Sequence, residues 1–328
     1  MDSPVIGAGG GNNPTVGIAD ESKLISRRQT MAKTPESKTN LDYGMRVLEG
    51  VNGLPKVLLT HPSGTSAEVY MNGAHVTSWK TPSGEELLFL SRRAWFEPGK
   101  PIRGGIPIVF PQFSGQGPLP QHGLVRTIPW ELMESSIEDD DTIVAQLCVT
   151  DTIDTRTIWP HAFELCLKVR LETNRFILTL RVHSAGEGFD FQTAFHTYFR
   201  VTDITKTCVH GLDGSEFLDA LRGYVRERES REMIRFAQET DRIYVRTGDQ
   251  LVLEDAGSGS SIVITKQNMP DVVLWNPWVD KSRRMQDFAD DEYLGMVCVE
   301  TGVIEYPVHL TRGDTWEATT TFSYHRSI

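Results

Sequence analysis

PIRGGIPIVFPQF, the sequence of residues 101–113, is followed at residues 120–126 by PQHGLVR. The glycines and prolines let the main chain turn sharply and approach a ligand closely, which indicates a shaped loop rather than a helix or a central strand. Residues 98–130 contain no Asp or Glu but include Lys100, Arg103, His122 and Arg126, whereas the whole chain has a formal net charge of -11. A basic island in an acidic protein predicts an anionic ligand. The alternative is a structural turn whose arginines are merely solvated.

Length and composition limit the class of protein. The chain has 328 residues, enough for one large domain or two ordinary ones, and its 39% hydrophobic and 23% charged residues are typical of soluble globular proteins. No window approaches the roughly 18 uninterrupted apolar residues of a membrane span, so we expect no membrane partner. A pI near 5.3 disfavours nucleic acid as a partner, because such binding depends on a broad basic surface.

The cysteines give an expectation about redox state and metal. Cys148, Cys166, Cys208 and Cys298 are far apart in the sequence and lack the Cys-x-x-Cys or Cys/His spacing of a typical zinc site. We therefore expect reduced thiols, no zinc and an intracellular setting.

The first 42 residues differ in composition from the rest of the chain. They are rich in Gly, Ser, Asn, Thr and Lys and contain no aromatic residue, so they cannot bury enough surface to offset the entropy of ordering. We expect a flexible tail at 1–42 and a single domain at 43–328. An apolar secretory segment is absent, and acidic residues such as Asp20 and Glu21 disfavour a transit peptide. The expected location is the cytoplasm, with a plastid as the alternative.

From Tyr43 onward the patterns are those of strands and turns. Asn72-Gly73 lies between two apolar-rich runs, which is typical of a hairpin. Apolar and polar residues alternate over residues 163–171 and again over 176–182, which predicts a long half-buried hairpin. Further candidate strands are residues 251–253, 262–264 and 316–324. Such a succession predicts an all-β protein, a large antiparallel sandwich or a barrel, with few helices.

Two segments are ambiguous. Residues 218–238 contain Arg226-Glu227-Arg228-Glu229 and few turn formers, and are equally compatible with a charged helix. Residues 285–296 are compatible with a short helix, or with a turn at Asp290-Asp291.

Two strand-like segments carry candidate acid and base groups. A period of two places Phe191, Phe195 and Phe199 on one face and His196 on the other. The same period sends Val297 and Val299 inward and Glu300 to the opposite face with Cys298. Each residue has an ordinary alternative: a hydrogen-bonded strand histidine for His196, and a solvated edge-strand carboxylate for Glu300.

Five motifs together resemble the hexose-6-phosphate 1-epimerases of the galactose-mutarotase-like group, from about Leu54 to the C-terminus. The motifs are residues 101–107, 110–113, 121–126, 195–199 and 297–300. The resemblance implies an antiparallel β-sandwich with an open cleft, no metal and no organic cofactor. It also implies interconversion of the α and β anomers of glucose 6-phosphate, with a hexose 6-phosphate as the small-molecule partner. We expect the protein to be a monomer.

The resemblance also implies roles for individual residues. His196 matches the general acid that protonates the ring oxygen, and Glu300 matches the general base that accepts the proton of the C1 hydroxyl. The positions that match substrate-binding residues are Arg103, Gln121, His122, Arg126 and Asp241. One carboxylate and one imidazole suffice for such proton transfers, and guanidinium groups suit a phosphate. The alternatives are an aldose 1-epimerase of free sugars and a non-catalytic sugar-phosphate binding protein, because fold alone does not establish activity.

Overall fold

The computed structural model describes residues 43–326, which form three antiparallel β-sheets with few short helices. The all-β class and the sandwich predicted from the sequence are therefore confirmed. Residues 1–42 lie outside the described part, so the tail expected there, and with it the domain boundary, stays a prediction.

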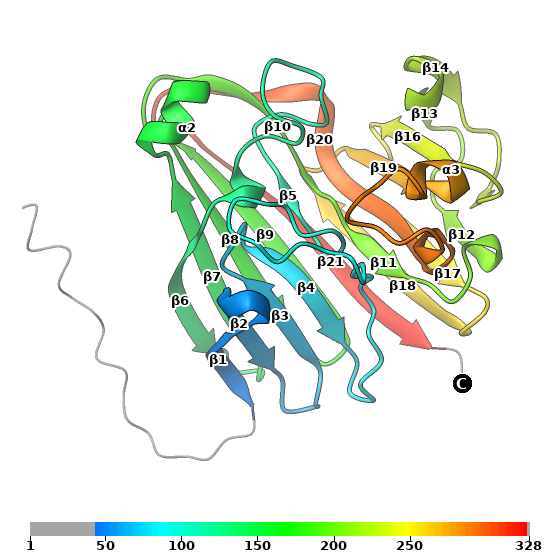
Figure 1. Ribbon diagram of the computed structural model, residues 1–328, viewed down its shortest axis with the longest axis horizontal. Coiled ribbons are helices and arrows are strands. Elements are labelled where there is room, and N and C mark those ends of the chain that lie inside the picture. The colour runs from blue at the N-terminus through cyan, green and yellow to red at the C-terminus, as the bar shows by residue number, and fades with distance from the viewer. Residues whose placement is uncertain (1–42, 327–328) are drawn as a thin grey trace, which may run out of the picture. The chain divides into compact units, whose positions relative to one another are not determined.

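The small sheet contains four strands in sequence order (Figure 1). Asn72-Gly73 lies in its third connection, where Tyr70 pairs with His75, so the predicted hairpin is confirmed. The strands are β1 (Gly44–Glu49), β2 (Pro55–Thr60), β3 (Ser66–Tyr70) and β4 (His75–Lys80).

The nine-stranded sheet follows the order β15-β12-β17-β18-β21-β9-β8-β7-β6. It contains the predicted long hairpin as β8 and β9, and the predicted strands at 251–253, 262–264 and 316–324 as β17, β18 and β21. The strands are β6 (Glu131–Ile137), β7 (Ile143–Thr150), β8 (Phe163–Leu171), β9 (Arg175–Ser184), β12 (Thr207–His210), β15 (Met233–Arg235), β17 (Gln250–Asp255), β18 (Ser260–Gln267) and β21 (Thr315–Arg326).

The eight-stranded sheet follows the order β14-β13-β16-β19-β20-β10-β5, with β11 also paired to β20. Its long strand β20 curves through the middle of the sheet (Figure 1). The strands are β5 (Ile108–Val109), β10 (Phe189–Phe195), β11 (Tyr198–Arg200), β13 (Glu216–Asp219), β14 (Val225–Arg228), β16 (Thr240–Val245), β19 (Asp271–Asn276) and β20 (Met296–Leu310).

Helices are short. Within residues 43–326 the two α-helices are α2 (Ile153–Ile158) and α3 (Trp278–Ser282), and single 3-10 turns are η1 (Val51–Gly53), η2 (Val125–Thr127), η3 (Ile204–Lys206), η4 (Ala220–Arg222) and η5 (Glu292–Gly295). Within residues 285–296 only η5 is helical, so the short helix considered there is reduced to one turn. No helix of the described residues has the length and apolar character needed to cross a membrane.

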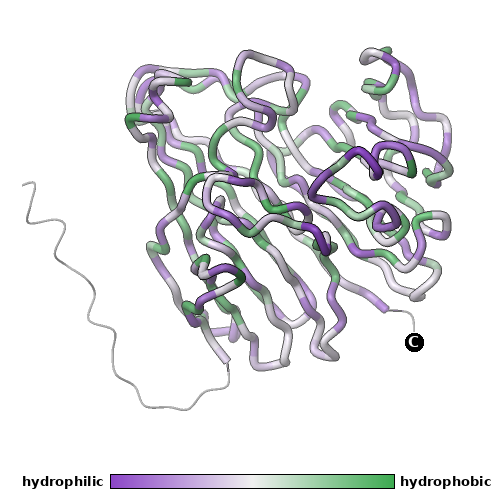
Figure 2. Tube along the Cα trace, viewed as in Figure 1, coloured by the Kyte–Doolittle hydropathy of each residue, from purple (hydrophilic) through white to green (hydrophobic). Residues whose placement is uncertain are grey.

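A large apolar core joins the three sheets. Trp79 of β4 stacks on Phe176 of β9 with 5.6 Å between ring centroids, and Val297 and Val299 of β20 belong to the same cluster. Hydrophobic residues follow the strands in Figure 2, alternating with more polar ones. A second apolar cluster, which includes Cys298 and Tyr198, covers the other face of the eight-stranded sheet. Both faces of β20 are therefore buried, and its period of two is confirmed.

The charged helix considered for residues 218–238 is wrong. This segment forms β13, η4, β14 and β15. Arg226 and Arg228 of β14 reach across to Glu216 of β13, at 3.2 and 3.3 Å. The alternating charges therefore pair between strands rather than along one face of a helix.

The expectation of four reduced thiols is also wrong, because Cys148 and Cys166 form a disulfide. The two residues lie directly opposite each other on β7 and β8, with Cα atoms 4.1 Å apart. Spacing along the chain gave no sign of this pairing, which depends on the register of two strands. The intracellular setting was inferred from reduced thiols and loses that support.

Candidate active site

Glu300 lies on an interior strand. β20 is flanked by β19 on one side and by β10 and β11 on the other, and Glu300 pairs with Val273 of β19. Its side chain is almost fully buried, with the residue 1% exposed. The alternative of a solvated edge-strand carboxylate is therefore wrong.

His196 occupies the short break between β10 and β11. Its backbone N–H donates to the Pro107 carbonyl at 3.0 Å, which holds the break against the loop that carries β5. The imidazole stacks on the Tyr198 ring, with 4.8 Å between centroids and 8° between planes. Phe195 and Phe199 point to the main core instead, so the faces predicted for this segment are confirmed.

The two groups meet at the bottom of a cleft. His196 Nδ1 lies 3.3 Å from Glu300 Oε1. Among the described residues, neither His196 Nδ1 nor Glu300 Oε2 has a well-aligned hydrogen-bond partner. Burial, reinforced by Asp241, raises the pKa of Glu300 well above its usual value. Burial and the nearby His122, Arg103 and Arg126 lower the pKa of His196. Burial thus favours the pair in which Glu300 holds the proton and His196 is neutral.

Arg103 reaches the same cleft from the loop at residues 101–113. Its guanidinium donates to Asp287 Oδ2 at 3.1 Å and to the Tyr198 hydroxyl at 2.9 Å. Asp287 is buried, and Tyr198 is the residue on which His196 stacks. These two contacts fix the position of Arg103 relative to the acid and base groups.

Close backbone packing shapes this loop. Gly105 has φ +61°, and a Cβ placed on it would stand 2.1 Å from the Val76 carbonyl oxygen. The Gly105 N–H donates to the Phe89 carbonyl at 2.7 Å, and its own carbonyl accepts from the Tyr198 N–H at 2.9 Å. Only glycine fits at this position, which fastens the loop to β4 and β11.

The second part of the basic island supplies the opposite wall. The His122 ring lies edge-on to His196 at 5.1 Å, and its Nδ1 accepts from the Ser114 N–H at 3.3 Å. Burial, with Arg126 and Arg103, lowers the pKa of His122 to about 3, so this ring is neutral. Gln121 is exposed at the rim of the cleft.

Arg126 lies behind this rim rather than on the cleft lining, and its guanidinium donates to the Gln121 carbonyl at 2.8 Å. Burial and the charge of Arg103 lower the pKa of Arg126 to about 10, although Tyr198 and Asp287 oppose the shift. Within the described residues no carboxylate lies within ion-pair distance of Arg126. The two arginines therefore leave uncompensated positive charge beside the cleft.

The far wall contains one predicted residue and one that the sequence did not reveal. Asp241 of β16 lines the cleft, and burial raises its pKa although Lys281 opposes the shift. Lys281 of α3 lies 3.4 Å from both Asp241 and Glu239. Lys281 also lies over the Trp275 ring, 5.5 Å from its centroid. No motif marked Lys281, because its segment shows no strand period.

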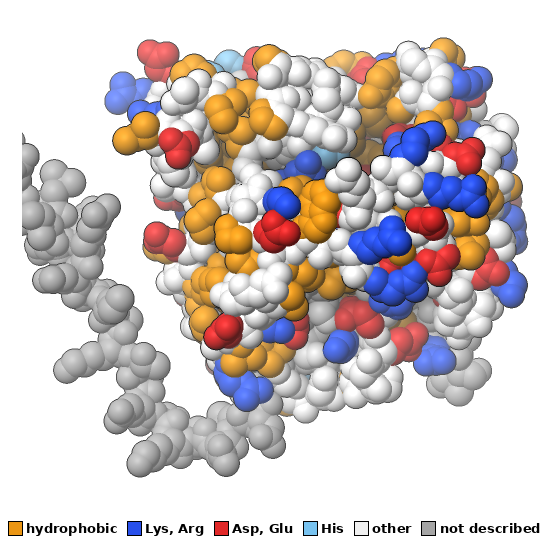
Figure 3. All heavy atoms as spheres, in the orientation of Figure 1, with side chains coloured by type: hydrophobic (Ala, Val, Ile, Leu, Met, Phe, Trp, Pro, Cys, Tyr) orange, Lys and Arg blue, Asp and Glu red, His pale blue; other side chains and the backbone are white. Residues whose placement is uncertain are grey.

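The cleft has a volume of about 250 Å³ and brings together six of the seven predicted site residues, with Arg126 just behind. The six are Arg103, Gln121, His122, His196, Asp241 and Glu300. On the face seen in Figure 3, basic side chains alternate with acidic ones rather than forming one broad basic patch.

A triad of His196, Cys298 and Glu300 also has its ligand atoms within 4.8 Å of one another, the spacing of a metal site. Burial raises the pKa values of both the Cys298 thiol and the Glu300 carboxyl. Both groups must lose a proton to bind a metal. Their environment favours proton transfer over metal binding.

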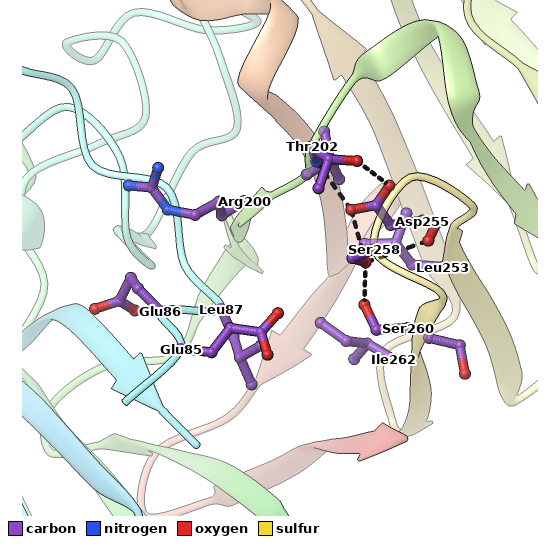
Figure 4. A pocket seen from close by; sticks show the side chains of 12 residues that line it. Glu85, Glu86, Leu87, Arg200, Thr202, Leu253, Asp255, Ser258, Ser260 and Ile262 are labelled. Carbon is purple, nitrogen blue, oxygen red and sulfur yellow. Dashed lines mark hydrogen bonds between the residues drawn. The ribbon is translucent and has the colours of Figure 1, made fainter. Parts of the chain in front are cut away.

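A second cavity, of about 310 Å³, opens between the β4–β5 connection and β17–β18 (Figure 4). Glu85, Glu86 and Asp255 line this cavity. Asp255 accepts from Thr202 Oγ1 at 2.6 Å, from the Thr202 and Gly257 N–H groups at 2.9 and 3.0 Å, and from Ser258 Oγ at 3.0 Å. Because both oxygens of Asp255 accept hydrogen bonds from neighbouring groups, this residue stabilises a turn. The second cavity is larger than the cleft but offers no comparable acid and base pair.

Comparison with known proteins identifies the family. The sequence profile described as aldose 1-epimerase matches residues 55–323. The chain belongs to the aldose 1-epimerase family. A relative from Cenchrus ciliaris, named "Putative glucose-6-phosphate 1-epimerase", is 40% identical over 278 residues, 81% of this chain and 83% of the relative. A relative of the same name from Escherichia coli (strain K12) is 35% identical over 269 residues, 79% of this chain and 89% of the relative.

A solved structure agrees with this assignment. The crystal structure of "a putative mutarotase (YeaD)" from Salmonella typhimurium matches with a TM-score of 0.77 at 30% identity, over 86% of this chain and 97% of that one. The resemblance inferred from the five motifs is confirmed. As a member of the aldose 1-epimerase family, the protein is an epimerase that interconverts the anomers of a sugar.

The packing of Gly105 generates a test of how the loop is held. Gly105→Ala should destabilise the epimerase by about 1–2 kcal/mol for the left-handed backbone, and further for the contact with the Val76 carbonyl. Gly99→Ala is the matched control, because Gly99 also has a positive φ, +77°, but no atom within 4 Å of the added Cβ. Urea unfolding of the two variants measures the difference. Equal losses of unfolding free energy would show that the close packing of Gly105 is unimportant.

Proposed function

We propose that this epimerase acts on hexose 6-phosphates, with glucose 6-phosphate as the main substrate. The observation that carries the proposal is the Glu300–His196 pair, 3.3 Å apart, at the bottom of a cleft that also contains Arg103. The relatives at 40% and 35% identity are named for glucose 6-phosphate. A free-sugar epimerase would need the pair but would have less use for the arginines.

In the proposed reaction the two groups move one proton each. Glu300, as a carboxylate, accepts the proton of the C1 hydroxyl, and His196, as an imidazolium, gives its proton to the ring oxygen. The C1–O5 bond breaks and the aldehyde forms. Rotation about C1–C2 presents the other face of the carbonyl, and the reverse proton transfers close the ring as the other anomer.

The number of protons on the pair is the same before and after ring opening. Neutral Glu300 with neutral His196 carries one proton, and so does the carboxylate with the imidazolium, so the two forms are tautomers. Burial favours the first form, as the directions of both pKa shifts indicate. The polar groups of a bound sugar would partly replace water around the second form, which is the form that opens the ring.

The phosphate is proposed to lie between Arg103 and Arg126. Their mutual repulsion contributes to the lowered pKa of Arg126, and an anion between them would relieve it. Guanidinium groups make charge-assisted, often bidentate hydrogen bonds to phosphate oxygens. Asp287 and Tyr198 hold Arg103 in place but leave donors of its guanidinium free for a ligand.

The remaining cleft residues are proposed to bind sugar hydroxyls. His122 accepts at Nδ1, so its Nε2 carries the hydrogen and is a neutral donor. Gln121 offers an amide at the rim, and Asp241 offers an acceptor on the far wall. Lys281, beside Asp241, keeps that carboxylate oriented and is proposed as an additional substrate-binding residue.

Cytoplasmic location and a monomeric state are part of this proposal. One chain supplies every group named in the proposed reaction, so the proposal needs no second copy. Imaging of the full chain with a C-terminal fluorescent tag would test the location.

Glu300→Gln should lower kcat on α-glucose 6-phosphate by about 10²–10⁴-fold, because the amide cannot accept the C1 hydroxyl proton. Substrate binding should survive. Glu305→Gln, the same change further along β20 and outside the cleft, is the matched control and should keep its activity. Polarimetry of freshly dissolved α-anomer, with thermal melting to check folding, measures both. A folded Glu300→Gln protein that still works at the wild-type rate would exclude Glu300 as the base.

The pH dependence of kcat/KM should reflect the joint titration of Glu300 and His196. A second proton at low pH occupies the base, and loss of the only proton at high pH removes the acid, so kcat/KM should fall on both sides. Because burial lowers the pKa of His196 from 6.5 and raises that of Glu300 from 4.5, the acid limb should lie below the ordinary histidine range and the alkaline limb above the ordinary carboxyl range. Initial rates across pH, corrected for spontaneous mutarotation, give the profile. A single acid limb centred near pH 6.5 would contradict the proposed pair.

Arg126→Ala should lower kcat/KM for glucose 6-phosphate by about 10- to 100-fold through loss of charge-assisted hydrogen bonds, mainly by raising KM. The rate on glucose should change little. Arg175→Ala, on β9 of the other large sheet, removes the same charge and is the control for non-specific attraction of the phosphate. If Arg126→Ala lowers kcat/KM for glucose and for glucose 6-phosphate by the same factor, the phosphate does not bind beside Arg126.

A further inference from the structure

Three side chains with metal-binding atoms converge on the outer face of the nine-stranded sheet. Cys208 and His210 are two residues apart on β12, so they share one face of the strand. Glu254 of β17 lies directly opposite Cys208. The intervening residues Val209 and Leu253 belong to the main core. Two adjacent strands of a packed sheet therefore hold all three groups.

The distances between the three ligand atoms fit a tetrahedral metal site. Cys208 Sγ lies 3.5 Å from His210 Nε2 and 3.7 Å from Glu254 Oε2, and His210 Nε2 lies 3.1 Å from Glu254 Oε2. Zinc bonds of about 2.3 Å to sulfur and 2.0–2.2 Å to nitrogen and oxygen imply separations of roughly 3.6 Å from sulfur to each other ligand and roughly 3.3 Å between nitrogen and oxygen. The observed triangle differs from this by only a few tenths of an ångström.

The site is open to solvent on one side. Cys208 is buried, whereas the side chains of His210 and Glu254 are 36% and 49% exposed. An ion can therefore enter between the two exposed groups and keep a water molecule as its fourth ligand. Only the thiol requires deprotonation in a buried position.

The surroundings of Cys208 argue against a reactive thiol. Burial and the nearby Glu254 raise the pKa of the thiol, although Arg235 opposes the shift. A protonated thiol is a poor nucleophile, which argues against a redox or catalytic role.

This site is separate from the cleft. The catalytic pair lies on the face of the eight-stranded sheet that turns away from the main core, and Cys208 lies on the corresponding outer face of the nine-stranded sheet. Two sheets and their core, about 10 Å between sheet planes, therefore separate the two groups of residues.

We propose that Cys208, His210 and Glu254 form a transition-metal site that binds zinc with three protein ligands and one open position. A thiolate, an imidazole and a carboxylate together suit this borderline-soft ion. The bound metal ties β12 to β17. The expectation of no zinc rested on close spacing of ligands in the sequence, but Glu254 follows His210 by 44 residues and reaches it only through strand pairing.

Cobalt(II) titration of the full chain, without reductant so that the Cys148–Cys166 disulfide stays intact, tests the site. We expect one thiolate-to-cobalt charge-transfer band in the near ultraviolet, saturating at one ion per chain and displaced by zinc chloride. Cys208→Ser should abolish the band. His210→Gln and Glu254→Gln, whose side chains are exposed, should fold normally and weaken binding by more than about 10-fold each. Zinc should raise the melting temperature of the wild type but not of Glu254→Gln.

Two control variants separate this site from others. Cys298→Ser should keep the band, since Cys298 is the only other free thiol. His309→Gln should also keep it, because His309 forms an exposed pair with Asp190 at 2.7 Å but is not one of the three proposed ligands. A band that survives in Cys208→Ser, disappears in Cys298→Ser, or is unaffected by both His210→Gln and Glu254→Gln would overturn the proposal. The absence of any band at millimolar cobalt would reduce the cluster to a histidine–carboxylate hydrogen bond beside a thiol.

Discussion

Glu300 and His196 are buried side by side in the cleft. Burying an ionisable pair costs solvation free energy, and this cost determines how the pair holds its proton. A carboxylate and an imidazolium lose much of their hydration when buried, so the pair is most stable with its single proton on Glu300. An interior strand holds Glu300 and the break between β10 and β11 holds His196, so the two groups lie 3.3 Å apart and the proton can redistribute when a sugar binds. The two apolar clusters on either face of the eight-stranded sheet keep β20 in this position.

The basic loop complements this pair. Arg103 is oriented by Asp287 and Tyr198, and Tyr198 in turn stacks on His196, so the cationic group and the acid group are parts of one packed unit. Arg126 adds charge that no carboxylate of the described residues offsets at ion-pair distance. A substrate with a phosphate at one end and a reactive C1 at the other would satisfy both requirements at once. This is the physical reason for proposing a phosphorylated sugar over a free one.

The sequence predicted those features that follow from local periodicity. The period of two correctly separated Glu300 and Cys298 from Val297 and Val299, and the alternation over residues 163–182 predicted the β8–β9 hairpin. Features that depend on the register of distant strands were not predictable. The Cys148–Cys166 disulfide requires the pairing of β7 with β8, and Lys281 reaches the cleft only through the position of α3 beside β16. Residues 218–238 were ambiguous because alternating charges are equally compatible with the surface of a helix and with a pair of strands.

The central claim is that the epimerase works on a phosphorylated sugar, and anomer exchange at equilibrium tests it most directly. Magnetisation transfer between the C1 resonances of the α and β anomers gives the catalysed exchange rate without any net reaction. Measured with the wild-type chain at equal concentrations well below saturation, exchange of glucose 6-phosphate should exceed that of glucose by at least about 10-fold, the value of one charge-assisted hydrogen bond. Exchange of glucose at an equal or greater rate, or no catalysed exchange of either sugar, would contradict the account.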